Sequence, residues 1–234
     1  MKFSALYQTY DAMREPNYAL KVGGKSLDVG DDARLTRVEC ELTCTRQAGV
    51  LALEAVLDPE QEHGAAWLDA FQPGAVCSFS IGYGKSLTEV FCGFLYDVLW
   101  SDPLNGTLML LEAVCLDVRG RLMLTSCADA GAQRAMSQMI QDILGQSCYS
   151  ELAKKRTIDP APKDWDLPAL RPGPSDYAVV CAAADFLCYE FYAFADELYF
   201  GKPRPESGAV LTFDGPNGLV SLKRRRTLAG QCAA

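Results

Sequence analysis

Apolar and polar residues alternate most regularly along residues 71–100. In the first half of this stretch, four apolar residues alternate with serine or glycine: Cys77, Phe79, Ile81 and Tyr83. In the second half the alternation returns with Val90, Cys92, Phe94, Tyr96 and Val98. A period of two residues is typical of a strand with one buried face, and Gly84-Lys85-Ser86 between the halves is a turn sequence. The pattern predicts a long β-hairpin, which is a building element without a catalytic side chain.

Shorter patterned segments flank this hairpin. Residues 34–46 place Val38, Cys40, Leu42 and Cys44 on one face of a predicted strand, and residues 51–57 form its return strand. Residues 3–10 and 18–22 predict two further short strands, and residues 64–71 predict two helical turns. The nearly all-apolar residues 107–118 indicate a strand buried on both faces. Many strands joined by short turns predict a sandwich or barrel, and we favour a barrel because it protects long apolar edges.

The pattern changes after residue 126. Five apolar residues then recur at helical spacing: Met136, Met139, Ile140, Ile143 and Leu144. Five prolines between residues 160 and 174 exclude a continuous helix there. Ser175 is a good N-cap, and Asp176 suits the dipole of the helix that follows. Residues 190–195 and 197–201 predict a tight hairpin, and strand-like sequence resumes after residue 206.

The net charge and hydropathy of the chain argue against several classes of function. The 234 residues include 30 acids and 22 bases, a formal charge of −8, which argues against nucleic-acid binding as the main role. The basic run 223–226 is more typical of a solvated strand end than of a nucleic-acid patch. No apolar stretch is long enough to predict a membrane span. Residues 1–13 lack the apolar core of a secretory signal peptide.

The ten cysteines indicate neither disulfides nor zinc. No CxxC pair occurs, and His63 is the only histidine, so the ligand spacing of a zinc site is missing. Cys40, Cys44, Cys92 and Cys115 alternate within apolar rows. Because free cysteine behaves as a small buried hydrophobe, we expect core thiols in a reducing cytoplasm and no metal site.

No catalytic or cofactor-binding constellation is apparent in the sequence. His63 lies in a polar stretch and is expected at the surface. Residues 82–86 superficially resemble a phosphate loop, but a strand follows them where a helix N-terminus is needed. The acid pairs Asp31-Asp32 and Glu60/Glu62 lie on predicted turns without an apolar pocket to raise a pKa. We therefore predict no catalytic residue and no cofactor.

Two groups of motif residues together resemble one known family. The first group comprises Phe71, Gly74, Val76, Gly82-Tyr83-Gly84 and Val90-Phe91-Cys92-Gly93-Phe94. The second begins at Ser175-Asp176 and a helix, and it ends in the hairpin sequence of residues 189–203. In this order they resemble the baseplate hub family of contractile phage tails, called late control protein D, and the N-terminal part of VgrG spike proteins of type VI secretion. Cys188 stands where that family usually has glycine.

The resemblance implies a mainly β fold with an α+β insertion. A tail-tube-like β-barrel would occupy residues 1–125, a small α+β domain residues 126–205, and the first strands of a second, incomplete barrel residues 206–234. Three copies would form a homotrimeric ring that links the tail tube to the central spike and leaves a lumen compatible with DNA passage. The subunit would assemble in the bacterial cytoplasm and then lie in the baseplate of a virion or injection particle.

Two hypotheses about function follow. The first is a non-catalytic ring subunit, in which the acidic Glu39/Glu41 face is a candidate lumen or solvent face. Its structural and assembly candidates belong to the central hairpin and its preceding turn: Phe71, Gly74, Gly82, Tyr83, Gly84, Phe91 and Gly93. The second is a ligand- or peptide-binding barrel, perhaps enzymatic, with a lumen lined by Tyr83, Tyr96 and Trp100. The sequence favours the first because it offers no convergent polar set for the second.

Overall fold

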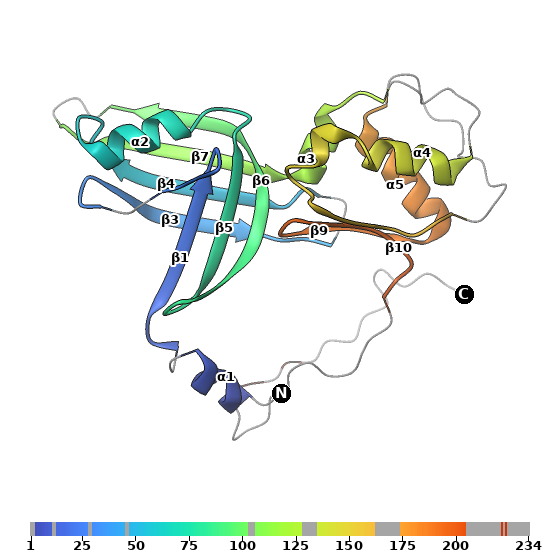
Figure 1. Cartoon of the computed structure of the whole chain (residues 1–234), viewed down its shortest axis with the longest axis horizontal. Coiled ribbons are helices and arrows are strands. Elements are labelled where there is room, and N and C mark those ends of the chain that lie inside the picture. Colours follow the sequence, from blue (N-terminus) through green and yellow to red (C-terminus); the bar gives the residue numbers. More distant parts are fainter. Residues whose placement is uncertain are drawn as a thin grey trace.

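The computed structural model describes residues 3–10, 13–27, 30–44, 47–102, 106–127, 135–161 and 174–204, together with Ser221 and Lys223. Within these residues, a curled antiparallel sheet lies beside a smaller unit of helices and strands (Figure 1). The predicted mainly β class with an α+β part is confirmed. The strands predicted after residue 206 lie outside the described residues.

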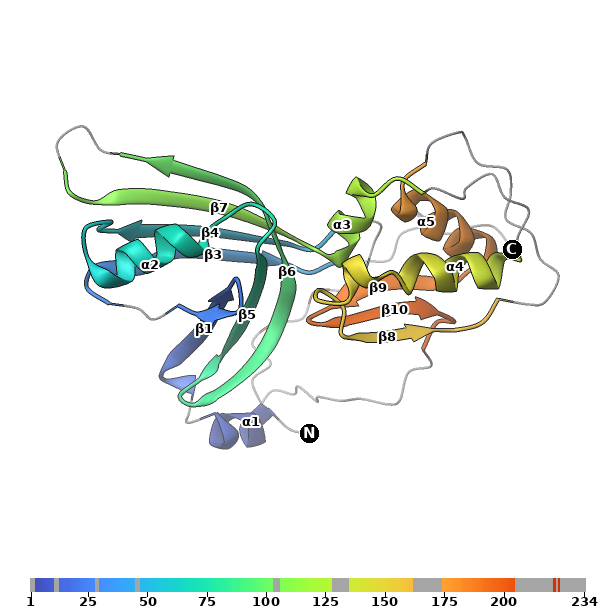
Figure 2. The ribbon, with the colours of Figure 1, turned by 45° about the horizontal axis from the view of Figure 1, so that its top comes forward.

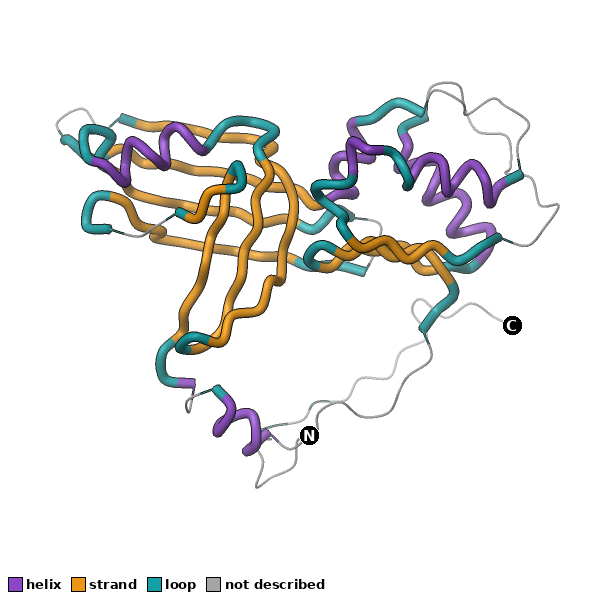
Figure 3. Tube along the Cα trace, in the orientation of Figure 1, coloured by secondary structure: helices purple, strands orange, loops and turns teal. Residues whose placement is uncertain are grey.

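Seven strands form the curled sheet, and every neighbouring pair is antiparallel. The strands are β1 (Pro16–Val22), β2 (Lys25–Ser26), β3 (Ala33–Glu41), β4 (Val50–Leu57), β5 (Val76–Tyr83), β6 (Ser86–Ser101) and β7 (Met109–Asp117). Their order across the sheet is β2-β1-β5-β6-β7-β4-β3. The sheet curls into a half-barrel whose two edge strands are β2 and β3 (Figure 3).

The long strand β6 belongs to both halves of the sheet. Residues 86–94 of β6 pair with β5, whereas residues 93–101 pair with β7. Register shifts lie between Phe79 and Ser80 on β5 and between Leu95 and Asp97 on β6. Extra residues at such bulges bend a strand and increase its twist. The bent β6 therefore turns a flat ladder into a half-barrel.

The inner face of the half-barrel holds the first hydrophobic core. Alternate residues of β4 and β7 are fully buried there, as alternation predicts for strands with one apolar face. The helix α2 (Glu62–Ala70) covers this face and inserts Trp67, which is 1% exposed. Its C-cap residue Phe71 stacks on Trp67, with ring centroids 6.0 Å apart. The predicted helix at residues 64–71 is confirmed and starts two residues earlier.

The second core belongs to the α+β unit. Its helices are α3 (Val118–Leu124), α4 (Met136–Leu144) and α5 (Asp176–Leu187), with a 3-10 turn at Ser147–Tyr149. Its strands β8 (Lys155–Ile158), β9 (Glu190–Phe194) and β10 (Glu197–Gly201) form a small sheet in the order β8-β10-β9. Figure 2 shows the three helices on one face of this sheet. The helices predicted around residues 136–144 and after Ser175, and the predicted hairpin, are confirmed.

Several predictions from the sequence were wrong. Residues 3–9 form the helix α1 (Phe3–Thr9) rather than a strand. Helix α3 was not predicted, because VRGRLML was assigned to the end of an apolar strand and to the segment after it. The strand predicted to be buried on both faces, β7, buries only its inner face fully, and Glu112 on its outer face is exposed. Pattern alone does not reveal what packs against the second face of a strand.

The cysteine prediction was only partly right. Cys77, Cys92 and Cys115 are buried, but Cys40 of edge strand β3 and Cys44, three residues after its end, are exposed. A hydrogen bond to the Cys115 thiol, together with burial, raises the pKa of Cys77, and burial raises the pKa of Cys92 to about 11. Among the described residues, no group of three or more histidine, cysteine or acidic side chains is placed to hold a metal ion.

Candidate assembly surface

Gly93 lies at the point where β5, β6 and β7 meet. It pairs with Cys77 on one side and with Asp117 on the other. A Cβ atom at this position would collide with the carbonyl oxygen of Leu116 and would lie 2.7 Å from the Phe91 ring. Glycine is therefore required here for close approach of the neighbouring backbone, as its place in a strand interior suggests.

Two phenylalanines of the first motif group are part of the first core. Phe91 and Phe71 are each 1% exposed. Phe71 meets Trp100 of β6 edge-on, at 6.4 Å between ring centroids. These contacts fix α2 against the half-barrel, because edge-to-face aromatic packing adds stability beyond the area it buries.

The remaining motif residues shape the two turns. Gly74 has φ +87° and donates its N–H to the carbonyl of Leu95 at 2.7 Å. Gly84 has φ +55° at the hairpin tip, and a Cβ at Gly82 would collide with the carbonyl oxygen of Ser86. Tyr83 lies beside the ring of Tyr10, with centroids 6.3 Å apart. The glycines thus serve backbone geometry, and Tyr83 connects the hairpin tip to the residue after α1.

The central hairpin is internal to the sheet rather than at its edge. Strand β5 pairs with β1, and β6 pairs with β7 over its second half. The free edge of the four-stranded half is β3, whose last residues Cys40 and Glu41 are exposed, as is Leu42 at 41%. An edge strand presents unpaired backbone groups to a neighbouring chain. An edge for another subunit is therefore offered by β3, not by the hairpin.

The outer face of strands β3, β4, β7 and β6 carries ordered rows of side chains. One row runs across the four strands from Arg37 through Glu54 and Glu112 to Leu99, which is 54% exposed. Arg37 forms ion pairs with Glu54 at 3.0 Å and with Glu39 at 2.5 Å. The next row contains Glu39, Ala52, Val114 and Asp97. Since α2 packs on the inner face, this outer face is a broad surface on which charged and apolar side chains occur together in each row.

A buried ion pair joins the sheet to the α+β unit. Arg119 is 0% exposed, and its guanidinium donates to Asp117 Oδ2 from Nε at 3.0 Å and from a terminal nitrogen at 2.8 Å. The same carboxylate accepts the backbone N–H of Gly49 at 2.7 Å, and its other oxygen caps α3 by accepting the N–H of Arg119. Asp117 therefore ties the β3–β4 turn to the start of the second unit.

The middle of β6 forms the other part of this junction. Residues 91–95 of β6 are all buried, although they alternate between the two faces of the sheet. Phe91 and Leu95 belong to the core of the sheet, whereas Phe94 belongs to the core of the α+β unit. Phe91 also forms an isolated bridge with Ala195 in the β9–β10 turn. The apolar run in the sequence thus reflects a second unit packed against the outer face of this segment.

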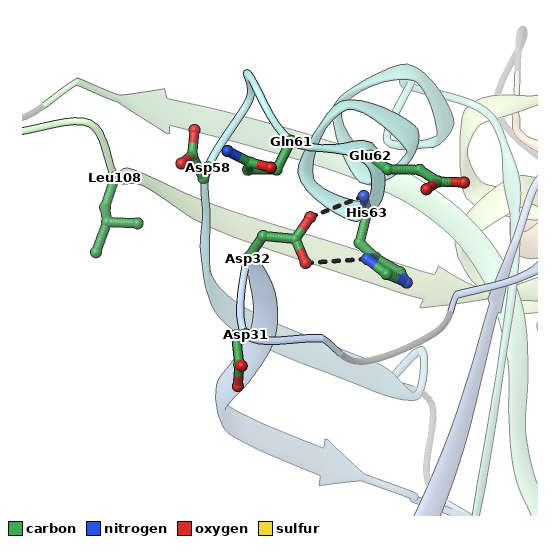
Figure 4. Close-up of a pocket in the computed structure, with 7 residues that line it drawn as sticks. All are labelled: Asp31, Asp32, Asp58, Gln61, Glu62, His63 and Leu108. Atoms are coloured by element: carbon green, nitrogen blue, oxygen red, sulfur yellow. Dashed lines mark hydrogen bonds and ion pairs between the residues drawn. The ribbon is translucent and has the colours of Figure 1, made fainter.

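An acidic depression lies beside α2 (Figure 4). Asp32 accepts hydrogen bonds from the backbone N–H of His63 at 2.8 Å and of Gly64 at 3.2 Å. Its other oxygen lies 2.9 Å from His63 Nδ1. Although desolvation opposes the shift, the backbone hydrogen bonds from Gly64 and His63 lower the pKa of Asp32. Asp32 thus caps the N-terminus of α2, because the first N–H groups of a helix need acceptors.

His63 is partly exposed, with 42% of its side chain accessible. Its ring contact with Asp32 fixes the turn before α2 but lies in an open, solvated setting together with Asp31, Asp58 and Glu62. Sequence reasoning placed these residues on turns and missed that the chain brings them together. The arrangement caps the helix and offers no enclosed pocket in which a carboxylate and an imidazole would exchange protons with a substrate.

The aromatic residues proposed to line a ligand-binding lumen do not converge. Tyr83 lies at the hairpin tip, Trp100 lies at the opposite end of β6 against Phe71, and Tyr96 at the bulge is 51% exposed.

Among the helices of the described residues, none has the length and apolar character of a membrane span.

Comparison with known structures identifies the fold. The chain is similar to the 43 kDa tail protein of prophage MuSo2 from Shewanella oneidensis, with a TM-score of 0.55 and 14% identity over 80% of this chain and 53% of that one. It is similar to a tail protein from Neisseria meningitidis MC58 at the same TM-score and identity, over 84% of this chain and 53% of that one. A Francisella PdpA-VgrG complex aligns at a TM-score of 0.47 and 9% identity, over 84% and 30% of the two chains.

The first two matches show that this chain has the fold of phage tail proteins. The resemblance indicated by the motifs is thus confirmed at the level of the fold. The chain spans about half the length of these two proteins. No protein-family model matches the chain, and no curated protein matches it.

Proposed function

We propose that the chain is a structural subunit of the baseplate hub of a phage tail, or of a related contractile injection device, without enzymatic activity. Three copies form a ring that joins the tail tube to the central spike. The observation that carries this proposal is the shared fold with two phage tail proteins over at least four fifths of the chain.

The surface of the half-barrel supports a ring. The edge strand β3 offers backbone groups, and an interface that joins this edge to a different surface of the next copy closes into a ring when the rotation permits. The outer face of the four-stranded half suits a lumen, since its outward charged side chains are two arginines and five acids: Arg34, Arg37, Glu39, Glu41, Glu54, Asp97 and Glu112. A mainly acidic wall repels the phosphates of a polyanion, so DNA would pass without binding.

The proposal includes a location and partners. The subunit assembles in the bacterial cytoplasm and ends in the tail or baseplate of the particle, where the tube and spike proteins contact the ring. The candidate assembly residues Phe71, Gly74, Gly82, Tyr83, Gly84, Phe91 and Gly93 act indirectly, by holding the half-barrel in the shape that the ring needs.

Sedimentation velocity and negative-stain microscopy of the purified full chain test the ring. We expect a concentration-dependent trimer with a central opening. A variant that places proline at Cys40, whose N–H faces the free edge of β3 rather than β4, is expected to abolish the trimer while circular dichroism remains unchanged, since proline is tolerated on edge strands but blocks further pairing. Proline at the exposed loop residue Lys85 is the matched control. A strict monomer at every accessible concentration contradicts the proposal.

A further inference from the structure

A cleft of about 380 Å³ lies where the chain leaves β3 and meets the α+β unit. One wall carries Cys44, three residues after the end of β3. The other walls come from α5 and from the segment leading into β9: Cys181, Ala184, Asp185, Tyr189, Glu190 and Phe191. A pocket of this size accommodates one or two long side chains. Because its walls belong to both units, an occupant would contact both at once.

The lining combines an apolar floor with an acidic rim. Ala184 and Phe191 are 6% and 8% exposed and form apolar surface at the base. Asp185 and Glu190 are exposed at the rim. A long basic side chain fits such a site, because its alkyl stem lies on apolar surface while its charged head remains near carboxylates and solvent.

The same unit already holds one arginine in this way. The Arg204 guanidinium lies over the Tyr199 ring, 4.1 Å from its centroid, and pairs with Glu197 at 2.8 Å. Both Tyr199 and Glu197 belong to β10, next to β9. In this small sheet, an aromatic ring beside a carboxylate thus already binds an arginine side chain.

The chain also contains a matching basic segment. Four consecutive cations occupy residues 223–226 in a chain of net charge −8. Lys223 is exposed in the structure and is not among the residues that line the cleft. Several other arginines are already engaged: Arg37 with glutamates, Arg119 with Asp117, and Arg156 with backbone carbonyls. The basic run therefore has the charge complementary to the acidic rim of the cleft.

We propose that this cleft binds the basic run 223–226 of a neighbouring copy of the chain. One of its arginines lies along Phe191, with its guanidinium at Glu190. The contact rests on the proposed ring, in which neighbouring copies are held side by side, and it adds an electrostatic link that selects the correct neighbour.

A labelled peptide of residues 217–228 tests the site directly by fluorescence anisotropy with the full chain. We expect saturable binding that weakens as salt rises. Glu190→Lys is expected to weaken binding at least tenfold, because it replaces an attractive charge with a repulsive one. Glu60→Lys is the matched control, since Glu60 is an exposed acid near α2, far along the chain from the cleft, and its substitution should change affinity less than twofold.

Two outcomes of the peptide experiment overturn the proposal. Equal weakening by Glu60→Lys would show general attraction to an acidic protein rather than a site. Unchanged binding in Glu190→Lys would show that the cleft is not the site. Circular dichroism of each variant confirms folding, which exposed positions such as Glu190 should preserve.

Sedimentation of the full chain separates this contact from the ring itself. Glu190→Lys and Arg225→Glu should each raise the concentration needed for assembly about tenfold, and their combination in one chain should recover part of the loss because the charges are exchanged. If the wild type assembles and the variants assemble equally well, the cleft proposal fails and the ring stands. If the wild type never assembles but the peptide binds at the cleft, the ring fails. If either variant changes the melting temperature by the same amount at every protein concentration, the basic run binds the cleft of its own chain. This result would overturn the assignment to a neighbouring copy.

Discussion

The core of the half-barrel and the core of the α+β unit differ in the buried charged side chains that lie beside them. The first core is built from apolar side chains of paired strands and α2. Among the described residues, the three buried charged side chains are Asp117, Arg119 and Asp176, and all lie at the starts of α3 and α5. Strands satisfy each other's backbone groups, whereas a helix N-terminus leaves N–H groups without partners. Where the start of a helix is buried, as in α3 and α5, an acidic side chain is therefore buried beside it.

The buried acid of α5 illustrates the cost of this arrangement. Asp176 accepts hydrogen bonds from the Tyr149 hydroxyl at 2.6 Å and from Gln146 at 3.0 Å. Desolvation by burial and this hydrogen bond both raise the pKa of Tyr149, so the hydroxyl keeps its proton. The stability of the half-barrel thus depends on close packing of neighbouring strand backbones, as at Gly93. The stability of the α+β unit depends on hydrogen bonds to its buried acid, Asp176.

Gly93→Val should give the largest effect, because it attacks the close packing on which the half-barrel depends. The added side chain would meet the Leu116 carbonyl and the Phe91 ring, so we expect a loss of about 3 kcal/mol or more and a low soluble yield. Urea unfolding measures the loss. The control Thr88→Val, at an exposed position of the same strand, should change stability by less than about 0.5 kcal/mol. A Gly93→Val protein that folds and assembles normally would contradict this account.

Arg119→Met tests the ion pair at the junction. It leaves the Asp117 carboxylate buried without its cation, and we expect a loss of about 3 kcal/mol. Chemical denaturation should show it, while Arg34→Met, at an exposed outward position of β3, should be nearly neutral. In the double variant with Asp117→Asn, the loss should be smaller than the sum of the two single losses, since neither charge remains. Strict additivity would mean that the two side chains do not act as a pair.

Tyr149→Phe tests the hydrogen bond between the Tyr149 hydroxyl and the buried Asp176 carboxylate in the α+β unit. It removes one hydrogen bond from buried Asp176 and should cost about 1–2 kcal/mol. Thermal unfolding is a suitable measurement. Tyr96→Phe, at a residue 51% exposed, removes the same hydroxyl at the surface and should have little effect. If the two variants behave alike, the buried network contributes nothing measurable.

Cys188→Gly should give the smallest effect and the opposite sign. Cys188 ends α5 with φ +53°, a left-handed conformation that costs an L-residue about 1–2 kcal/mol. Glycine removes this strain but has a more flexible unfolded state, so we expect a net gain of about 0.5 kcal/mol. Cys148→Gly, at an exposed cysteine without positive φ, should instead destabilise slightly. A destabilised Cys188→Gly protein would show that the thiol makes a contact worth more than the strain.

The position of Cys188 also explains one motif of the sequence. A left-handed C-cap is the usual reason for glycine after a helix, and cysteine occupies that position here in the strained conformation. Cysteine at this position is a departure from the family that the motifs resemble, and the backbone angle gives a physical reason for glycine there.

Other parts of the site were beyond sequence reasoning. Asp32 and His63 lie 31 positions apart and meet only because β3 and β4 bring the two turns together. The cleft beside α5 joins Cys44 to Phe191 across 147 positions of chain. No periodicity reports such contacts, because they depend on the path of the chain through both units.

The sequence by itself determined the local elements of this protein. Alternation predicted the β5–β6 hairpin and the β3–β4 pair, and helical spacing with an N-cap predicted α4 and α5. These patterns are local consequences of strand and helix geometry. The motifs also indicated the phage tail fold before any strand order was known.

Only the tertiary structure decided which faces are covered. Cys40 of edge strand β3 and Cys44 just after it are exposed, whereas residues 91–95 of β6 are buried on both faces. Alternation states which residues share a face, but burial depends on what packs against that face, and here the α+β unit covers the middle of β6. The same long-range packing placed the hairpin inside the sheet and left β3 as its edge.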